Sequence, residues 1–416
     1  MKVVQLKSES IKTLREKRRM IMKQMIEGQE GSLLVLKTAY LGEDRQHHIV
    51  SYALFTIFFE LWERFTMVSW SYTFDDEGLI FYIKLDDPAA RVKDVLVHFE
   101  DYHPLGFAID SDVFDKDHEV TRKELNMEER IDFYFEKPLE SLVGEEIADK
   151  DYCTTFKSKI EDYMLDGDKQ TILSNILVYS YVSAYTKTLG FGMYGPNYKG
   201  SNDQMNFEKF VHFLRTYREE TLHIFEVNSK DTDAILRYQE EVDRKIKLAV
   251  LNQQSHYYTV FMTSIVLFAF INSRGYADIN KQIQTIAKEL EKKEAFKGKE
   301  CLRFDSALKG FRDSFKHYVP FYQKHDSIIA TLLHIMSRHD DYAVMCFNGE
   351  KTLRKAQFLA KNLVFKEDKW DTLNQFCTSN YLYPHDDTTL LVVTVMLDVL
   401  QRNYLKIKLL FDTNQY

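Results

Sequence analysis

The sequence predicts a multidomain protein in which an α+β domain, residues 1–145, is followed by an all-α domain, residues 165–416. Three observations support this fold class. The chain has 416 residues, which is more than a single hydrophobic core normally organises. Strand and helix patterns alternate up to residue 145, whereas only helical periodicity follows residue 170. The 15 glycines and 6 prolines are few for this length, as long helices require.

The composition excludes several classes of protein. Hydrophobic residues make up 45% of the chain, so large cores can form and a disordered protein is not expected. The net charge of -8 predicts binding neither to nucleic acid nor to an anionic membrane. The most apolar segment, residues 257–271, is short for a membrane span and predicts a buried core helix. Four dispersed cysteines and an N-terminus without an apolar signal segment favour the reducing cytoplasm.

The first 85 residues predict the start of the α+β domain in four steps. Residues 9–27 read as an amphipathic helix with a basic face, and residues 32–36 read as a buried strand. Residues 46–65 predict a helix. Residues 67–74 and 79–85 predict the two strands of a hairpin around a glycine-containing loop.

The next apolar run, residues 95–99, also reads as a strand, and a Pro-Leu-Gly turn then leads into a further extended segment from Ile109 to Phe114. Residues 139–170 are rich in Asp, Glu and Lys and predict a linker to the helical domain. In that domain the apolar residues recur at helical spacing, for example at Ile279, Ile283 and Ile286.

The extended segment carries the strongest candidate for chemistry. Side chains alternate along a strand, so Asp110 and Asp112 project to one face, about 6–7 Å apart. Two neighbouring carboxylates repel each other unless a divalent cation lies between them or one binds a proton. Enzymes that transfer phosphoryl or nucleotidyl groups hold Mg²⁺ in this way. Turns also collect Asp residues for local hydrogen bonding, and the spacing alone leaves both interpretations open.

A second candidate lies in the helical half. Residues 190–200 contain four glycines, among them Gly200, and Ser201 follows before an amphipathic helix. Glycines before a helix N-terminus can present backbone N–H groups to a phosphate. The alternative is a long interhelical loop that needs left-handed conformations.

Residues 100–113 read Glu-Asp-Tyr-His-Pro-Leu-Gly-Phe-Ala-Ile-Asp-Ser-Asp-Val, with Thr121 and Arg122 downstream. They resemble the pattern Glu-x-x-His-Pro-Leu-Gly-Arg-x-x-Asp-x-Asp-Val of the citrate lyase holo-acyl-carrier-protein synthases. The resemblance covers roughly residues 10–140. It implies a nucleotidyltransferase-like α+β domain whose site residues are the catalytic His103, Asp110, Asp112 and Arg122, the substrate-binding Gly106, and Asp110 and Asp112 as ligands of Mg²⁺ or Mn²⁺.

The chain departs from that family at three positions. Phe107 stands where the family has arginine after the glycine. Asp132 and Phe135 stand where the family has cysteines after Arg130.

The helical half resembles the triphosphoribosyl-dephospho-CoA synthases over about residues 165–400. The resemblance implies His256 and Asp341 as catalytic residues, and Lys187, Gly200, Ser201 and Gly349 as nucleotide-binding residues. The spacing and apolar frame of that family are kept, whereas most of its polar and glycine positions are not.

Together the two resemblances imply an enzyme that makes and attaches the prosthetic group of citrate lyase. The helical half would join ATP and dephospho-CoA with release of adenine. The α+β half would transfer the product to a serine of the citrate lyase acyl carrier protein with release of pyrophosphate. An alternative is a degenerate relative that binds the carrier protein or the nucleotide without turnover. The lost motif residues favour this alternative, whereas the surviving pair Asp110 and Asp112 opposes it.

Overall fold

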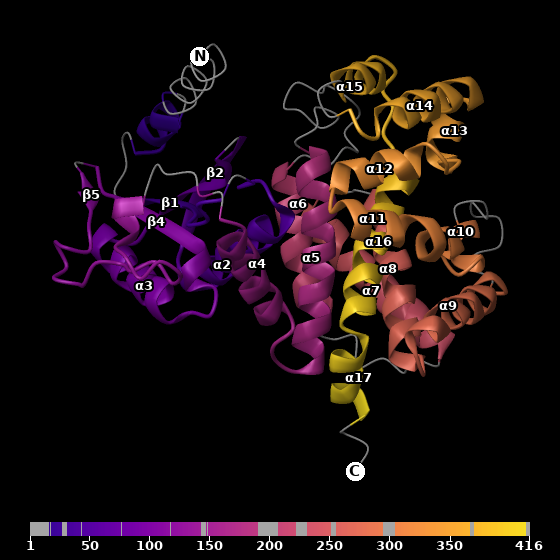
Figure 1. Cartoon of the computed structure of the whole chain (residues 1–416), viewed down its shortest axis with the longest axis horizontal. Helices are drawn as coiled ribbons and strands as arrows, with labels where there is room; N and C mark the ends of the chain where they lie inside the picture. Colours follow the sequence, from indigo (N-terminus) through magenta and orange to yellow (C-terminus); the bar gives the residue numbers. More distant parts are fainter. Residues whose placement is uncertain are drawn as a thin grey trace. The chain divides into compact units, whose positions relative to one another are not determined.

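The computed structural model describes residues 16, 18–26, 31–42, 44–75, 77–116, 118–142, 147, 149–189, 207–221, 231–250, 255–293, 304–366 and 370–412. The chain divides into two compact units, Met1–Tyr163 and Met164–Tyr416 (Figure 1). The first combines a small antiparallel sheet with helices, and the described part of the second is helical.

Unit 1, Met1–Tyr163, contains one five-stranded sheet in the order β2-β3-β1-β4-β5, with antiparallel neighbours throughout. The predicted first strand and the predicted hairpin are confirmed, and residues 18–26 are helical as predicted. The elements along the chain are β1 (Ser32–Thr38), α2 (His48–Arg64), β2 (Met67–Asp75), β3 (Gly78–Leu85), α3 (Ala89–Tyr102), η1 (Gly106–Ala108), β4 (Ile109–Phe114), β5 (Glu119–Val120), η2 (Leu139–Leu142) and α4 (Lys150–Met164).

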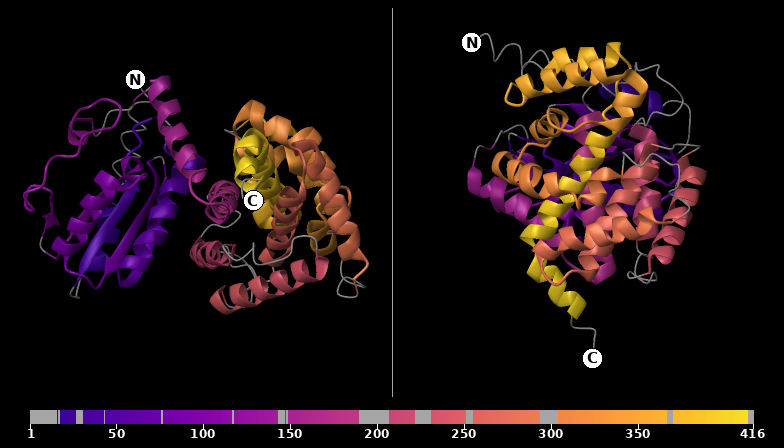
Figure 2. Two further views of the ribbon diagram at one scale, coloured as in Figure 1. Left: turned by 90° about the horizontal axis from the view of Figure 1, so that it is seen from below. Right: turned by 90° about the vertical axis from the view of Figure 1, so that its right-hand side faces the viewer.

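The two faces of this sheet have different coverings. The face that carries Leu36, Phe81 and Ser111 packs against α2 and α3. Figure 2 shows helices of this unit lying against the sheet. Phe58 of α2 stacks on Phe81 with ring centroids 4.3 Å apart. We call this the helix-covered face. The opposite face carries Lys37, Asp110 and Asp112, and we call it the Asp face. Helical residues 18–26 supply the side chains that pack on its apolar part, namely Ile21, Met22, Met25 and Ile26 against Leu33, Val35, Ile80 and Tyr82.

One expectation for unit 1 was wrong, and another is modified by the structure. Residues 95–99 belong to helix α3, because the buried positions Val92, Leu96 and Phe99 recur at helical spacing over a window longer than the apolar run. The predicted linker, residues 139–170, includes the boundary between the two units after Tyr163. It also contains helix α4, whose Tyr152, Phe156 and Ile160 are fully buried. An acidic, lysine-rich stretch is therefore an amphipathic helix with one buried stripe.

Unit 2, Met164–Tyr416, contains no strand in its described part, which agrees with the all-α expectation. Helix α16 is buried along residues 386–400 and packs against α5, α8 and α12. The elements are α5 (Lys169–Leu189), α6 (Phe207–Thr221), α7 (Thr232–Val250), α8 (Ser255–Asn272), α9 (Tyr276–Glu291), α10 (Asp305–Leu308), η5 (Ser314–Tyr318), α11 (Val319–His325), α12 (Ile328–Met336), α13 (Tyr342–Asn348), α14 (Glu350–Leu363), α15 (Trp370–Ser379), α16 (His385–Arg402) and α17 (Tyr404–Asp412).

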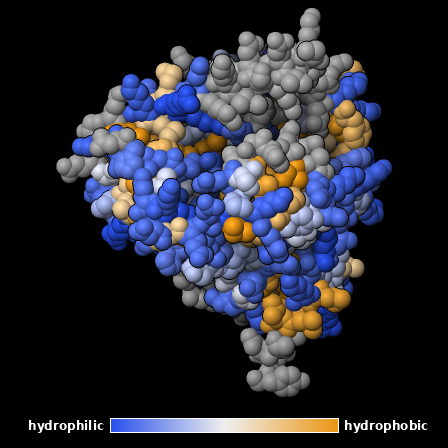
Figure 3. Space-filling model, turned by 60° about the vertical axis from the view of Figure 1, so that its left-hand side comes forward, coloured by the Kyte–Doolittle hydropathy of each residue, from blue (hydrophilic) through white to orange (hydrophobic). Residues whose placement is uncertain are grey.

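The apolar segment at residues 257–271 lies within α8, and residues 259–270 are all buried, so the predicted core helix is confirmed. Among the described residues, no helix combines the length and apolar character needed to cross a membrane. The face seen in Figure 3 is mostly hydrophilic, apart from apolar patches such as the one at the place of α17, where Leu405 and Leu409 are exposed.

Candidate functional site

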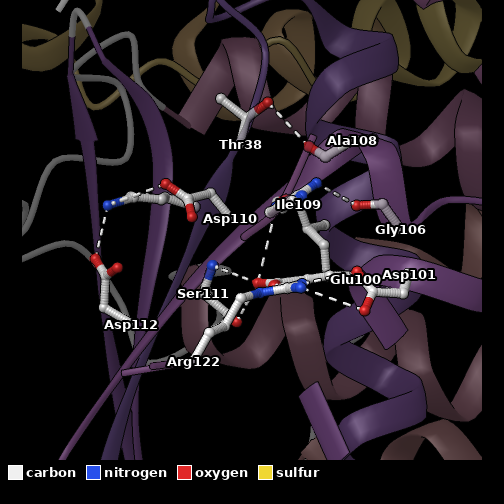
Figure 4. Close-up of polar contacts among 12 residues, drawn as sticks. Thr38, Glu100, Asp101, Gly106, Ala108, Ile109, Asp110, Ser111, Asp112 and Arg122 are labelled. Atoms are coloured by element: carbon white, nitrogen blue, oxygen red, sulfur yellow. Dashed lines mark hydrogen bonds and ion pairs between the residues drawn. The ribbon is translucent and has the colours of Figure 1, made fainter. Parts of the chain in front are cut away.

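Strand β4 presents the two predicted carboxylates on the Asp face, so the predicted alternation is confirmed. Asp110 lies opposite Lys37 of β1 in the antiparallel register. The Lys37 Nζ atom is 3.2 Å from Oδ2 of Asp110 and 2.6 Å from Oδ2 of Asp112. Figure 4 labels the two aspartates. The carboxylate side chains are 26% and 29% exposed. One cation therefore already lies between the two carboxylates, at a place that solvent can reach.

The electrostatics of this group are those of an acidic cluster with one resident cation. Burial raises the pKa of Asp112, and Asp110 adds to the rise, whereas Lys37 opposes it. Burial alone would lower the pKa of Lys37, but the two carboxylates outweigh it and raise that pKa. Burial and the neighbouring Asp112 raise the pKa of Glu119 on β5. Carboxylate oxygens are the ligands that Mg²⁺ and Mn²⁺ prefer, so the side chains of Asp110 and Asp112 are suitable ligands for such an ion.

Charged side chains replace a neighbouring strand along the outer edge of β4. Strand β5 pairs only with Val113 and Phe114. Beyond it, the Ser111 carbonyl accepts a 2.6 Å hydrogen bond from Lys93, and the Ile109 carbonyl accepts one from Arg130. These bonds satisfy backbone groups that an unpaired edge would leave open. They hold the strand that carries the Asp pair.

Glu100 of α3 is the centre of this anchoring network. Its side chain is 2% exposed, and its Oε1 accepts hydrogen bonds from both the N–H and the hydroxyl of Ser111. Its Oε2 accepts a 2.7 Å bond from Arg122, which also binds Asp101 at 2.8 Å. The guanidinium of Arg122 is thus engaged on the helix-covered side of β4, away from the carboxylates of Asp110 and Asp112 (Figure 4).

His103 and Gly106 shape the turn that leads from α3 to β4. The Nδ1 atom of His103 accepts a bond from the Leu105 N–H, and its Nε2 lies 3.3 Å from Glu60 of α2. A Cβ at position 106 would lie 2.3 Å from the Phe99 carbonyl oxygen, so only glycine allows this close approach. The contacts described for His103 do not include the Asp pair.

The three departures from the resembled pattern have a common neighbour in α4. Phe107 packs against Phe156 with ring centroids 5.1 Å apart, and Phe135 stacks on Tyr152 at 5.3 Å. Asp132 accepts hydrogen bonds from the backbone N–H groups of residues 134 and 135, which fixes the turn that carries Phe135. The substituted positions therefore build the surface on which α4 packs.

In unit 2, Asp341 caps helices. Its Oδ1 accepts a bond from the Val344 N–H of α13, and its Oδ2 accepts one from the Asp386 N–H at the start of α16. Asp386 in turn caps α13, because its Oδ2 accepts a hydrogen bond from the Tyr342 N–H. Burial raises the pKa of Asp341 well above its ordinary value, and Asp387 and Asp386 add to the rise. Both carboxylate oxygens are used by backbone donors.

The other predicted residues of unit 2 form no described site. Gly349 precedes α14 with φ +82° and is exposed, and apart from its chain neighbours no atom lies within 4 Å of the place that a Cβ would occupy. Gly200 and Ser201 lie outside the described residues, as do the side chains of Lys187 and His256.

Sequence reasoning missed Lys37. The sequence carried a partial signal, because Leu33, Val35 and Lys37 stand at alternate positions and therefore share one face of the strand. What the alternation does not reveal is the register that sets Lys37 opposite Asp110.

The comparisons with known proteins concern unit 1. Residues 7–133 match the family model of the apo-citrate lyase phosphoribosyl-dephospho-CoA transferases. The match includes the turn with His103 and Gly106, strand β4 and Arg122, and it covers less than a third of the chain. It supports transfer of the prosthetic group to apo-citrate lyase as the activity of this region, but it does not extend to a fused synthase. None of the curated proteins matches the chain significantly.

Proposed function

We propose that unit 1 transfers a phosphoribosyl-dephospho-CoA group from triphosphoribosyl-dephospho-CoA to a serine of the citrate lyase acyl carrier protein. The observation that carries the proposal is the pair Asp110 and Asp112, which share one face of β4 and one cation within the region that matches the transferase family. A nucleotidyltransferase-like fold and a Mg²⁺ or Mn²⁺ requirement belong to the same proposal.

Asp110 and Asp112 would hold the divalent ion, which supplies charge neutralisation for the departing pyrophosphate. The chain's own contribution is position. The bonds from Glu100, Lys93 and Arg130 to the edge of β4 keep the two carboxylates in place, which matters because small displacements of reacting groups are costly. Arg122 acts through Glu100 in this scheme and holds the strand from behind.

The test is mass spectrometry of the apo-carrier protein after incubation with this protein, triphosphoribosyl-dephospho-CoA and Mg²⁺. Wild-type protein should add the phosphoribosyl-dephospho-CoA mass, and Asp110→Asn should slow the transfer by about 100-fold or more. Asp94→Asn is the matched control, since Asp94 is exposed on α3 and the charge change is the same. Full transfer by Asp110→Asn would contradict the role of the pair. Carrier binding without any transfer by the wild type would favour the non-catalytic alternative.

We propose a non-catalytic role for unit 2. The observation behind this is that Asp341, the predicted catalytic carboxylate, is fully buried and uses both oxygens to bind helix N-termini. A group so engaged is a poor ligand or base for a nucleotide. Incubation with ATP, dephospho-CoA and Mg²⁺ should release little or no adenine. Robust adenine release would restore the bifunctional assignment, in which unit 2 makes the donor for unit 1.

A further inference from the structure

The ammonium group of Lys37 lies between the carboxylates of Asp110 and Asp112. It contacts Oδ2 of Asp110 and Oδ2 of Asp112, at 3.2 Å and 2.6 Å. A lysine ammonium has three donors and no acceptor, so it cannot be a metal ligand. A divalent cation bound between these two oxygens would therefore compete with the ammonium for them, and their like charges would repel each other.

The ammonium group of Lys37 can move away from the carboxylates of Asp110 and Asp112. The Lys37 side chain is 34% exposed and lies on the Asp face at the end of β1, so the four-carbon stem can turn toward solvent. Val35, the preceding residue on this face of β1, is apolar, so its side chain offers the ammonium no competing acceptor. Once displaced, the ammonium stays within the length of its own stem from the metal.

We propose that Lys37 is an exchangeable counter-ion that a divalent cation displaces from Asp110 and Asp112, after which the ammonium binds the diphosphate part of the nucleotide substrate. The inference rests on the proposed function, because it takes the Asp pair as the metal site. Before the metal binds, Lys37 keeps the two carboxylates from repelling each other. Afterwards it supplies a positive charge to the phosphates on the same face. Metal binding and phosphate binding are thereby coupled through one side chain.

The first measurement is the affinity for Mn²⁺ alone, by electron paramagnetic resonance of the free ion or by calorimetry. Lys37→Met removes the competitor and should bind Mn²⁺ about three- to tenfold more tightly than the wild type. Lys116→Met is the matched control, because Lys116 is exposed between β4 and β5 and its loss changes the net charge equally. Lys37→Arg keeps the positive charge, and its planar guanidinium can donate hydrogen bonds to both carboxylates. It should therefore be harder to displace, and the variant should bind Mn²⁺ more weakly than the wild type.

The second measurement is the affinity for inorganic pyrophosphate at saturating Mn²⁺. Lys37→Met, which should bind Mn²⁺ more tightly than the wild type, should bind pyrophosphate about tenfold more weakly. Without metal, the double variant Asp110→Asn, Asp112→Asn should bind pyrophosphate more tightly than the wild type, because its Lys37 is no longer held. Adding Lys37→Met to that double variant should remove the gain.

The outcomes separate this inference from the proposed function. Mn²⁺ binding that is absent from the wild type, or unchanged by Asp110→Asn, refutes the metal site and the inference together. Mn²⁺ binding that depends on Asp110, but is unchanged or weakened by Lys37→Met, overturns the role of Lys37 alone. If Lys37→Met does not fold, an unchanged or higher Mn²⁺ affinity of Lys37→Arg overturns it. Opposite shifts of metal and pyrophosphate affinity in Lys37→Met support it.

Discussion

Glu100→Gln tests whether the residues behind β4 hold the strand or take part in the reaction. Glu100 is buried and accepts hydrogen bonds from the Ser111 N–H, the Ser111 hydroxyl and Arg122, and Arg130 lies 3.8 Å away. Glutamine has nearly the same volume, so no cavity is made. Its amide oxygen can still accept from Ser111, but its NH₂ group then faces the guanidinium of Arg122, donor against donor.

The expected loss of unfolding free energy follows from these contacts. Removing one partner of a buried ion pair typically costs about 3–5 kcal/mol. Arg122 keeps its bond to Asp101, which is partly exposed, so the charge left behind is not wholly uncompensated. We therefore expect a loss of about 2–4 kcal/mol for Glu100→Gln. In a double-mutant cycle, Glu100→Gln and Arg122→Gln should couple by about 1–3 kcal/mol.

The assay is urea unfolding followed by circular dichroism, with the exposed Glu140→Gln of η2 as the control for loss of one negative charge. Transfer activity should fall in step with the fraction of folded protein. A variant that unfolds within about 0.5 kcal/mol of the wild type yet loses transfer would refute the reasoning, because Glu100 would then act on the substrate and not on β4.

Three further predictions concern packing, pH and unit independence. Phe156→Ala should lower the unfolding free energy by about 3–5 kcal/mol, because this fully buried ring packs on four other aromatic rings, as denaturant unfolding can measure. The second prediction concerns the pKa of His339. Burial by itself would lower this pKa, but the hydrogen bond to Asp387 outweighs burial and raises it from 6.5 to about 9. This folded-state pKa exceeds the unfolded one, so the stabilisation is complete below pH 6.5 and is lost as the pH rises toward 9. The stability difference between wild type and His339→Gln should shrink by about 2–3 kcal/mol over that range. Fragments 1–163 and 164–416 should each unfold in one cooperative transition when expressed separately.

Each of these predictions has a matched control. Phe358→Ala removes an exposed ring of α14 and should cost little, so equal losses at positions 156 and 358 would contradict the packing argument. His98→Gln removes an exposed histidine, and a pH dependence that His98→Gln abolishes but His339→Gln retains would contradict the assignment. A fragment that ends at residue 145 lacks α4 and should be less stable than fragment 1–163. Equal stability would show that α4 is not part of that unit.

The elements that the sequence predicted correctly are those whose pattern is local. The apolar run of β1, the hairpin of β2 and β3, and the alternation of Asp110 and Asp112 depend on backbone geometry within a few residues. The same holds for α8, whose apolar character needs no partner to be recognised. Residues 95–99 were misread because a five-residue apolar run has the same composition in a buried strand and in a helix.

The partners of the charged groups depended on the tertiary structure. Lys37 and Asp112 are 75 positions apart in the chain, and only the pairing of β1 with β4 brings them together. Arg122 and Asp341 belong to motifs that predict catalysis. In the structure, Arg122 binds Glu100 and Asp101. Asp341 accepts hydrogen bonds from the N-termini of two helices. A carboxylate or guanidinium has the same chemistry in a site and in a scaffold. Which one it serves is decided by the donors and acceptors that the folded chain brings within hydrogen-bonding distance.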